Sequence, residues 1–132
     1  MAIINVDLGN IPETTLLDKG EYEVRVVGKP VVKTSQAGNN YINVALEALD
    51  NPTADTVYHI LTLPNQGEIE MHSLRRRRDI ASLCATFGVD HNNGELDLDQ
   101  FEGKSGYVLM GIEEGSGNYP QRNKVTSLLP AR

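Results

Sequence analysis

Short stretches of alternating polar and apolar residues dominate the chain after residue 19, and this alternation is typical of strands that bury one face. The clearest example begins at Gly20 and continues through Val26. We expect this first strand to run to about Lys33, with Pro30 at an edge or a bulge, because proline cannot donate to a strand ladder. Four further strands are predicted at about 41–49, 56–63, 106–113 and 121–129.

Between the third and fourth strands the period changes to that of a helix, which we expect at about 68–87. Asn65 and Glu68 resemble a capping box at its start, and Gly88 suits a left-handed cap at its end. Apolar residues at i, i+3, i+4 and i+7 predict a packed face: Ile80, Leu83, Cys84 and Phe87. Residues 89–104 are polar and acidic, and we expect a loop there with at most one turn at 98–101.

This order of three strands, one helix and two strands is that of the OB-fold. The OB-fold is a five-stranded, partly open Greek-key barrel that binds ligands on strands 2 and 3 and in the loops between strands 1 and 2 and strands 4 and 5. The sequence therefore predicts an all-β fold with one helix, a five-stranded OB-type barrel. We expect one domain at 20–132, preceded by an irregular segment at 1–19, where Gly9, Asn10 and Pro12 interrupt any period.

The composition is that of a folded protein, with 132 residues, 39% hydrophobic and 23% charged. No apolar run is long enough to span a membrane. The first residues lack the basic and apolar regions of a secretory signal. Cys84 is the only cysteine, which excludes an internal disulfide and fits a reducing cytoplasm. We therefore expect a cytoplasmic protein that does not contact membranes, in the host cell if the gene is carried by a phage.

The net charge of −6, from 12 basic and 18 acidic residues, counts against nucleic-acid binding. Neutralisation of phosphates supplies most non-specific affinity for nucleic acids. The charges are unevenly distributed, however: acid gathers at 95–102 and 113–114, and base at 75–78 and 122–124. An acidic protein with such a distribution can still carry a local basic groove.

Four consecutive arginines, Arg75 to Arg78, fall within the predicted helix. A helix turns about 100° per residue, so they spread around its axis and form no single basic stripe. Arg75 and Arg78 are expected on the solvent side, and Arg76 and Arg77 nearer the packed face. We favour solvated arginines paired with nearby acidic residues, with a DNA path or a partner contact as the alternatives: the acids are Glu68, Glu70, Asp79 and the 95–102 loop.

Sequence-independent binding of a single strand needs flat side chains for base stacking and cations for the phosphates. The strand pattern directs Tyr41, Tyr58 and Tyr107 outward, places Tyr119 in the loop between the last two strands, and leaves only Tyr22 with the core. Tyrosine is also common on exposed strand faces because it packs across strands. The candidate nucleic-acid-binding residues are Lys33, Tyr41, Asn43, Tyr58, Tyr107, Tyr119, Arg122 and Lys124.

Enzyme chemistry is not predicted. The histidines His59, His72 and His91 and the single Cys84 are scattered, with no pair at metal-ligand spacing. The sequence has neither a P-loop nor a dinucleotide-binding glycine motif, and Asp97 with Asp99 lacks the rest of a calcium loop. We therefore expect no catalytic residue, no metal and no cofactor.

Six short motifs occur in the same order in phage-encoded OB-fold single-stranded-DNA-binding proteins: Gly20-x-Tyr22, Tyr41-Ile42-Asn43-Val44, Leu61-Thr62-Leu63-Pro64, Ala85-Thr86-Phe87-Gly88-Val89, Phe101-x-Gly103-Lys104-x-Gly106 and Asn123-Lys124-Val125. The chain resembles that family over residues 20 to 130. The resemblance implies a protein that coats single-stranded intermediates in phage replication or recombination. It also implies a groove on strands 2 and 3, with matching positions at Tyr41, Asn43, Tyr119, Arg122 and Lys124.

The expected partner is therefore single-stranded DNA, and replication or recombination proteins are candidate partners. Many members of that family carry an acidic C-terminal tail that recruits such proteins, whereas this sequence ends Leu128-Leu129-Pro130-Ala131-Arg132. The alternative is an OB-like protein-interaction or virion structural module that does not bind DNA. An open barrel leaves an edge that can pair with another copy, so both a monomer and a homodimer stay open.

Overall fold

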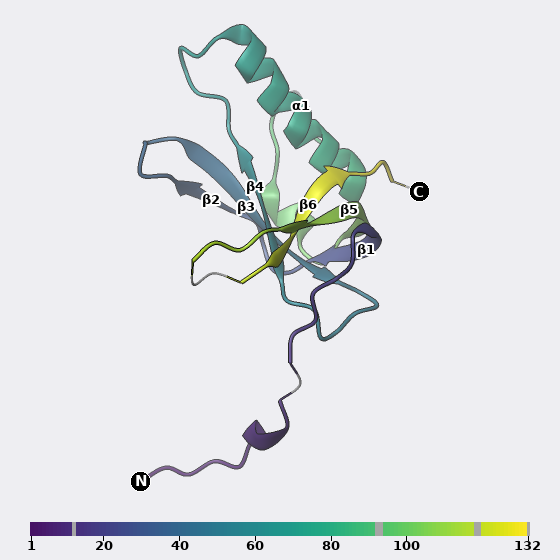
Figure 1. Cartoon of the computed structure of the whole chain (residues 1–132). Helices are drawn as coiled ribbons and strands as arrows, with labels where there is room; N and C mark the ends of the chain where they lie inside the picture. The colour runs from purple at the N-terminus through teal and green to yellow at the C-terminus, as the bar shows by residue number, and fades with distance from the viewer. Residues whose placement is uncertain (12, 92–93, 118–119, 132) are drawn as a thin grey trace.

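The computed structural model describes residues 1–11, 13–91, 94–117 and 120–131 (Figure 1). Over these residues the protein is mostly β with a single α-helix. The helix α1 spans Glu70–Phe87, and two 3-10 turns, η1 and η2, span Leu8–Asn10 and Leu98–Phe101. The six strands are β1 (Gly20–Val26), β2 (Val31–Thr34), β3 (Asn40–Ala48), β4 (Val57–Thr62), β5 (Ser105–Glu113) and β6 (Arg122–Leu128).

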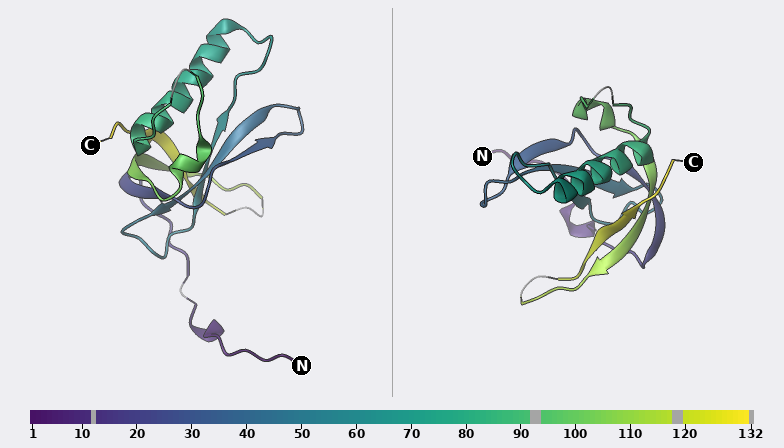
Figure 2. Two further views of the ribbon diagram at one scale, coloured as in Figure 1. Left: turned by 180° about the vertical axis from the view of Figure 1, so that it is seen from behind. Right: turned by 90° about the horizontal axis from the view of Figure 1, so that it is seen from above.

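The strands form one antiparallel sheet, in which β3 pairs with β4 along one edge and with both β1 and β2 along the other. The sheet continues from β1 to β5 and then to β6. It curls strongly, and α1 lies across one end of it (Figure 1, Figure 2). Among the described residues β4 and β6 are not paired, so the sheet stays open between these two strands.

The expected first strand is wrong in one respect, because the chain breaks it into β1 and β2. Gly28 adopts a left-handed φ of 68°, and Pro30 follows it without a backbone N–H. Before the break β1 pairs with the end of β3, and after it β2 pairs with the start of β3. The sheet therefore has six strands instead of five, although β1 and β2 share one edge of β3.

The helix also differs from its expected start. It begins at Glu70 after Ile69, which provides no side-chain cap, so the expected capping box of Asn65 and Glu68 is wrong. Glu68 instead forms an ion pair with Arg76 at 2.5 Å. The predicted end is confirmed, because Gly88 has a left-handed φ of 67° and its N–H donates to the Cys84 carbonyl.

The core lies between α1 and the concave face of the sheet. The alternating inward residues of β3, namely Ile42, Val44 and Leu46, are at most 2% exposed. Phe87 of α1 and Phe101 of η2 meet edge to face, with ring centroids 6.5 Å apart. The same burial pattern extends over β1, β4 and β5, and the further buried residues include Val24, Val26, Val57, Leu61, Leu83, Val108 and Met110.

The end of α1 packs closely on β5 because Gly106 has no side chain. A Cβ at Gly106 would lie 2.5 Å from the carbonyl oxygen of Thr86. The Thr86 hydroxyl is itself buried and donates to the Leu129 carbonyl at 2.6 Å. The helix is thus fixed to both β5 and the end of β6.

The segment before β1 is attached to the sheet at two points. The Leu17 N–H donates to Asn123 Oδ1 at 2.9 Å, and Asn123 Nδ2 donates back to the Leu17 carbonyl at 2.9 Å. Thr15 forms a parallel bridge with Ala54, just before β4. These contacts hold Leu17 between β4 and β6, the two strands that do not pair with each other. Leu17 is 4% exposed there.

Candidate nucleic-acid interface

Strands β2, β3 and β4 together present one face away from the core. Tyr41 of β3 lies between Lys33 of β2 and Thr62 of β4. Asn43 lies between Val31 and Ile60 in the same way, and Ala45 lies opposite Tyr58. Residues directly opposite each other in an antiparallel pair project to the same side. We call this surface the strand face; its residues are Val31, Lys33, Tyr41, Asn43, Ala45, Tyr58, Ile60 and Thr62.

The strand face is rich in apolar and aromatic surface. Tyr58 is 62% exposed and Ile60 is 57% exposed, and both lie on the same side of β4. The eight residues include no carboxylate, and Lys33 is the single charged one. Among the described residues Lys33 has no ion-pair partner. The face thus offers flat rings together with a free cation, the two requirements for holding a single strand.

Asn43 lies at the centre of the strand face. Its Oδ1 atom is buried, and no group among the described residues donates a hydrogen bond to it. An acceptor left without a donor costs about 1–3 kcal/mol.

A tight hairpin joins β2 and β3 beside Lys33. The connection is shorter than the predicted strand ends at about 33 and 41 imply, because β2 extends to Thr34 and β3 starts at Asn40. Thr34 Oγ1 donates to Asn40 Oδ1 at 2.8 Å, and the Gly38 N–H donates to the Ser35 carbonyl at 3.0 Å. These bonds fix the backbone that carries Lys33.

A groove of about 700 Å³ follows the gap between β4 and β6. Its lining includes Tyr58 and Ile60 of β4, Arg122 and Lys124 of β6, and residues 14–16. The carboxylates of Asp55 and Glu113 also line it. Because Tyr58 and Ile60 also belong to the strand face, the face and the groove are continuous. Cations from β6 therefore stand across the groove from the aromatic surface of β4.

Arg122 is already paired within the groove. Its Nε lies 2.7 Å from Glu113 Oε2, and the side chains are 77% and 46% exposed. The hydrogen bond and charge of Arg122, together with the charge of Lys124, hold the pKa of Glu113 below its usual range. Glu113 is therefore ionised at neutral pH and competes with any phosphate for Arg122.

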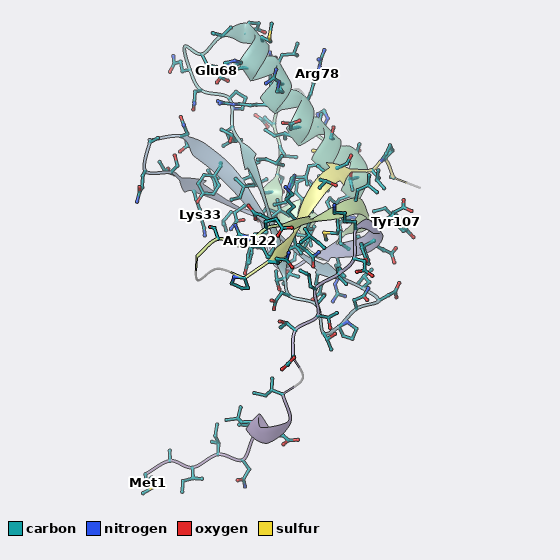
Figure 3. All side chains as sticks on the ribbon, in the orientation of Figure 1. Met1, Lys33, Glu68, Arg78, Tyr107 and Arg122 are labelled. Atoms are coloured by element: carbon teal, nitrogen blue, oxygen red, sulfur yellow. The ribbon has the colours of Figure 1, made fainter. Side chains whose placement is uncertain are left out.

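The structure brings together six of the eight predicted site residues, of which Figure 3 labels Lys33 and Arg122. Lys33, Tyr41, Asn43 and Tyr58 share the strand face, and Arg122 and Lys124 share the groove with Tyr58. Tyr107 is not part of this surface: it lies opposite Glu23 in the pairing of β5 with β1, on the other side of the molecule from Lys33 in Figure 3. Tyr119 lies outside the described residues.

Sequence reasoning missed two contributors. Ile60 has the same parity as Tyr58 along β4, so the alternation that directed Tyr58 outward also directs Ile60 outward. The pairing of Glu113 with Arg122 had no signal in the sequence, since it depends on the β5–β6 register that sets the two residues opposite each other.

Two of the four arginines have the expected acidic partners: Arg76 pairs with Glu68, and Arg77 pairs with Glu70. Arg76 is half-buried, as expected, but Arg77 is exposed like Arg75 and Arg78. The acidic loop pairs with Lys29 instead of the arginine run, since Lys29 lies 3.6 Å from Asp99. Half of the charge of the run is therefore balanced locally on α1.

Burial shifts the pKa of two side chains, the half-buried His59 and the buried Cys84. Burial lowers the pKa of His59 from its ordinary value of 6.5, and the opposing charge of Asp79 offsets part of this shift. Burial raises the pKa of the Cys84 thiol. Across the described ranges, no three histidine, cysteine or carboxylate side chains gather where they would hold a metal ion. No helix in the described part of the chain is long and apolar enough to cross a membrane.

The chain matches the model of the family described as "Protein of unknown function (DUF669)" over residues 4–125. The chain belongs to the DUF669 family. The DUF669 match includes the whole strand face, and it ends at Val125 within β6, so it also includes both groove cations. No curated protein sequence matches the chain.

Proposed function

We propose that this DUF669 protein binds single-stranded DNA without sequence preference, by stacking bases on the strand face and contacting phosphates from Lys33, Arg122 and Lys124. The observation that carries the proposal is the common face of Lys33, Tyr41 and Tyr58, drawn from three different strands. Every base has a flat surface, so stacking on tyrosine tolerates any sequence. No catalytic residue takes part.

The spacing of the two tyrosines bears on how a strand would lie. Tyr58 is opposite Ala45, four residues along β3 from Tyr41. At about 3.4 Å per residue this is a separation of about 14 Å along the strand direction. Tyr41 and Tyr58 would therefore stack on two bases that are not neighbours, with Asn43 and Ile60 contacting the nucleotides between them.

The fold that best accounts for this site is an OB-type barrel. In this interpretation β1 and β2 form one interrupted first strand, followed by β3, β4, the helix, β5 and β6. Residues of β4 and β6 come within 8 Å of each other, Cα to Cα, which is the approach expected of a partly open barrel. The strand face then corresponds to the ligand-binding strands 2 and 3 of that fold.

The biological role that we propose is to protect single-stranded intermediates in DNA replication or recombination, in a phage-infected cell. The alternative is a protein-interaction or virion structural module that uses the same apolar residues. Tyr58 and Ile60 would suit such an interface because both are more than half exposed. In that case the strand face would be covered by protein in an assembly.

Fluorescence anisotropy with labelled oligo-dT, duplex DNA and RNA distinguishes the two. We expect binding that favours the single strand and weakens as salt rises from about 50 to 200 mM. Tyr41→Ala and Tyr58→Ala should each lose about 1–3 kcal/mol, roughly five- to 150-fold in affinity. Tyr107→Ala is the matched control and should change little, because Tyr107 lies outside the strand face.

Two results would count against the proposal. The absence of oligo-dT binding at about 50 mM salt would remove DNA as the ligand, because phosphate contacts are strongest there. Equal losses for Tyr107→Ala and Tyr58→Ala would remove the strand face as the binding surface.

A further inference from the structure

The described residues before Leu17, which are 1–11 and 13–16, form an arm that extends away from the body of the protein (Figure 1, Figure 2). Six apolar side chains of residues 1–11 are each more than half exposed: Met1, Ile3, Ile4, Val6, Leu8 and Ile11. Single exposed apolar residues are ordinary, but a contiguous set marks an interaction surface. The arm is therefore a candidate for docking on another surface.

The attachment of the arm directs it outward. Thr15 and Ala54 form a parallel bridge, and the Thr15 N–H donates to the Thr53 carbonyl at 2.9 Å. In a parallel pair the residues before Thr15 run beside those before Ala54, and hence away from β4. Residues 3–14 can span about 40 Å when extended, about three times the radius of gyration of about 13 Å expected for the domain. The arm is long enough to reach a neighbouring molecule.

An apolar groove of about 650 Å³ lies between α1, the end of β2 and the segment 94–98. We call it the helix groove; apolar residues make up most of its lining, among them Val32, Leu63, Ile80, Ala81, Cys84 and Leu96. Ile42 also lines it and points to the opposite side of β3 from Asn43. The helix groove is thus separate from the strand face.

We propose that the arm of one molecule docks in the helix groove of a second copy of this chain. Ile4, Val6 and Leu8 would supply the apolar side chains that cover the groove. Asp7 lies among these arm residues, and the lining of the helix groove includes both Arg77 and Glu95, so Asp7 would have to lie beside Arg77 and away from Glu95. Arg77 now pairs with Glu70, but both side chains are at least half exposed, and such pairs contribute little. Arg77 can therefore exchange Glu70 for Asp7.

The contact is heterologous, because the arm and the helix groove are different surfaces of the chain. Such contacts repeat from copy to copy and give open chains unless the rotation closes a ring. The strand face stays uncovered in each copy. If the proposed function holds, copies linked in this way would bind a single strand cooperatively.

Disulfide trapping between two different variants tests the docking in the absence of DNA. One molecule carries Val6→Cys and the other Ala81→Cys, both in a Cys84→Ala background that adds no polar group to the core, so any disulfide joins two molecules. Met71→Cys replaces Ala81→Cys in the matched control, because Met71 is on α1 and 67% exposed but does not line the groove. All three positions are exposed, so the variants should keep the fold.

We expect the Val6–Ala81 disulfide to form faster than the Val6–Met71 disulfide, and Asp7→Arg to slow it. Sedimentation should show the wild-type mass rising with concentration, and an Ile4→Asp/Leu8→Asp variant remaining monomeric. Equal trapping rates for Ala81→Cys and Met71→Cys would overturn the proposal. So would a chain with both Val6→Cys and Ala81→Cys that forms only an internal disulfide, since the arm would then occupy its own groove. Neither result depends on DNA binding.

Discussion

Arg122 stands in the β4–β6 groove with a carboxylate already bound to it. Its partner Glu113 is ionised at neutral pH because the arginine lowers the pKa of Glu113. A phosphate must therefore displace Glu113 before it can use the full charge of Arg122. This competition gives the acidic residue beside the groove a definite role, which is to weaken anion binding.

Glu113→Gln should strengthen the binding of oligo-dT. Exposed ion pairs are weak, so the affinity should rise by at most about fivefold. Glu114→Gln is the control, because Glu114 accepts a hydrogen bond from Gln121 instead of Arg122. Unchanged or weaker binding by Glu113→Gln would argue against a phosphate at Arg122.

His59 makes the stability of the fold depend on pH. Burial lowers the pKa of His59 in the folded state, so below about pH 6.5 the unfolded chain binds a proton that the folded chain does not. The free energy of unfolding should therefore fall as the pH drops below 6.5, until the pH reaches the pKa of His59 in the folded state. Urea titrations of wild type and His59→Gln measure this, and the variant should show a smaller decrease over the same pH range.

At the scale of elements, the junction of α1 with β5 is the most closely packed contact described above. It depends on the missing side chain at Gly106, which lets the backbone of Thr86 approach the strand. The Thr86 hydroxyl then joins the same helix turn to Leu129 after β6. One helix turn thus holds two strands that lie beside each other in the sheet.

Gly106→Ala should lower the free energy of unfolding by about 1–3 kcal/mol, the usual cost of overpacking. The added methyl would lie 2.5 Å from the Thr86 carbonyl oxygen and 2.8 Å from its Cγ2 atom. Gly9→Ala is the control, because a Cβ there meets nothing within 4 Å. Chemical denaturation of both variants measures the difference, and equal stabilities would show that the helix can move away from β5 at little cost.

At the scale of the whole molecule, an excess of acid coexists with a small set of cations beside the strand face. With Lys33, Arg122 and Lys124 each contacting one phosphate, log K for oligo-dT should fall with log salt at a slope of about −2. Lys124→Gln should reduce that slope by about 0.7, whereas Lys29→Gln should not, because Lys29 pairs with Asp99. Anisotropy over a salt series measures both slopes.

The sequence alone predicts much of the strand face, because strict alternation fixes which side of β3 and β4 each residue occupies. Tyr41, Asn43 and Tyr58 were found together for this reason. Alternation could not separate Tyr107 from them. That residue also points outward, but the curl of the sheet through β1 carries β5 to the other side of the molecule.

The boundaries that failed depend on interactions remote in sequence. Glu68 was expected to cap α1, yet it pairs with Arg76 eight residues on, and the helix starts two residues later than predicted. The break between β1 and β2 was visible only as Pro30, whereas the left-handed turn at Gly28 allows both halves to pair with β3. Neither outcome follows from local propensity.

Cys84 is the sole thiol of the chain, so its reactivity can report the local opening of α1. It is 3% exposed beneath α1, and burial raises its pKa, so the folded protein presents almost no reactive thiolate. Alkylation of Cys84 requires a local opening in which α1 separates from the sheet. The alkylation rate therefore measures how often α1 opens, without an added label. A molecule that fills the helix groove, which Cys84 lines, would slow the same alkylation. The rate constant for alkylation of Cys84 would therefore report both the opening of the helix and the occupation of the groove.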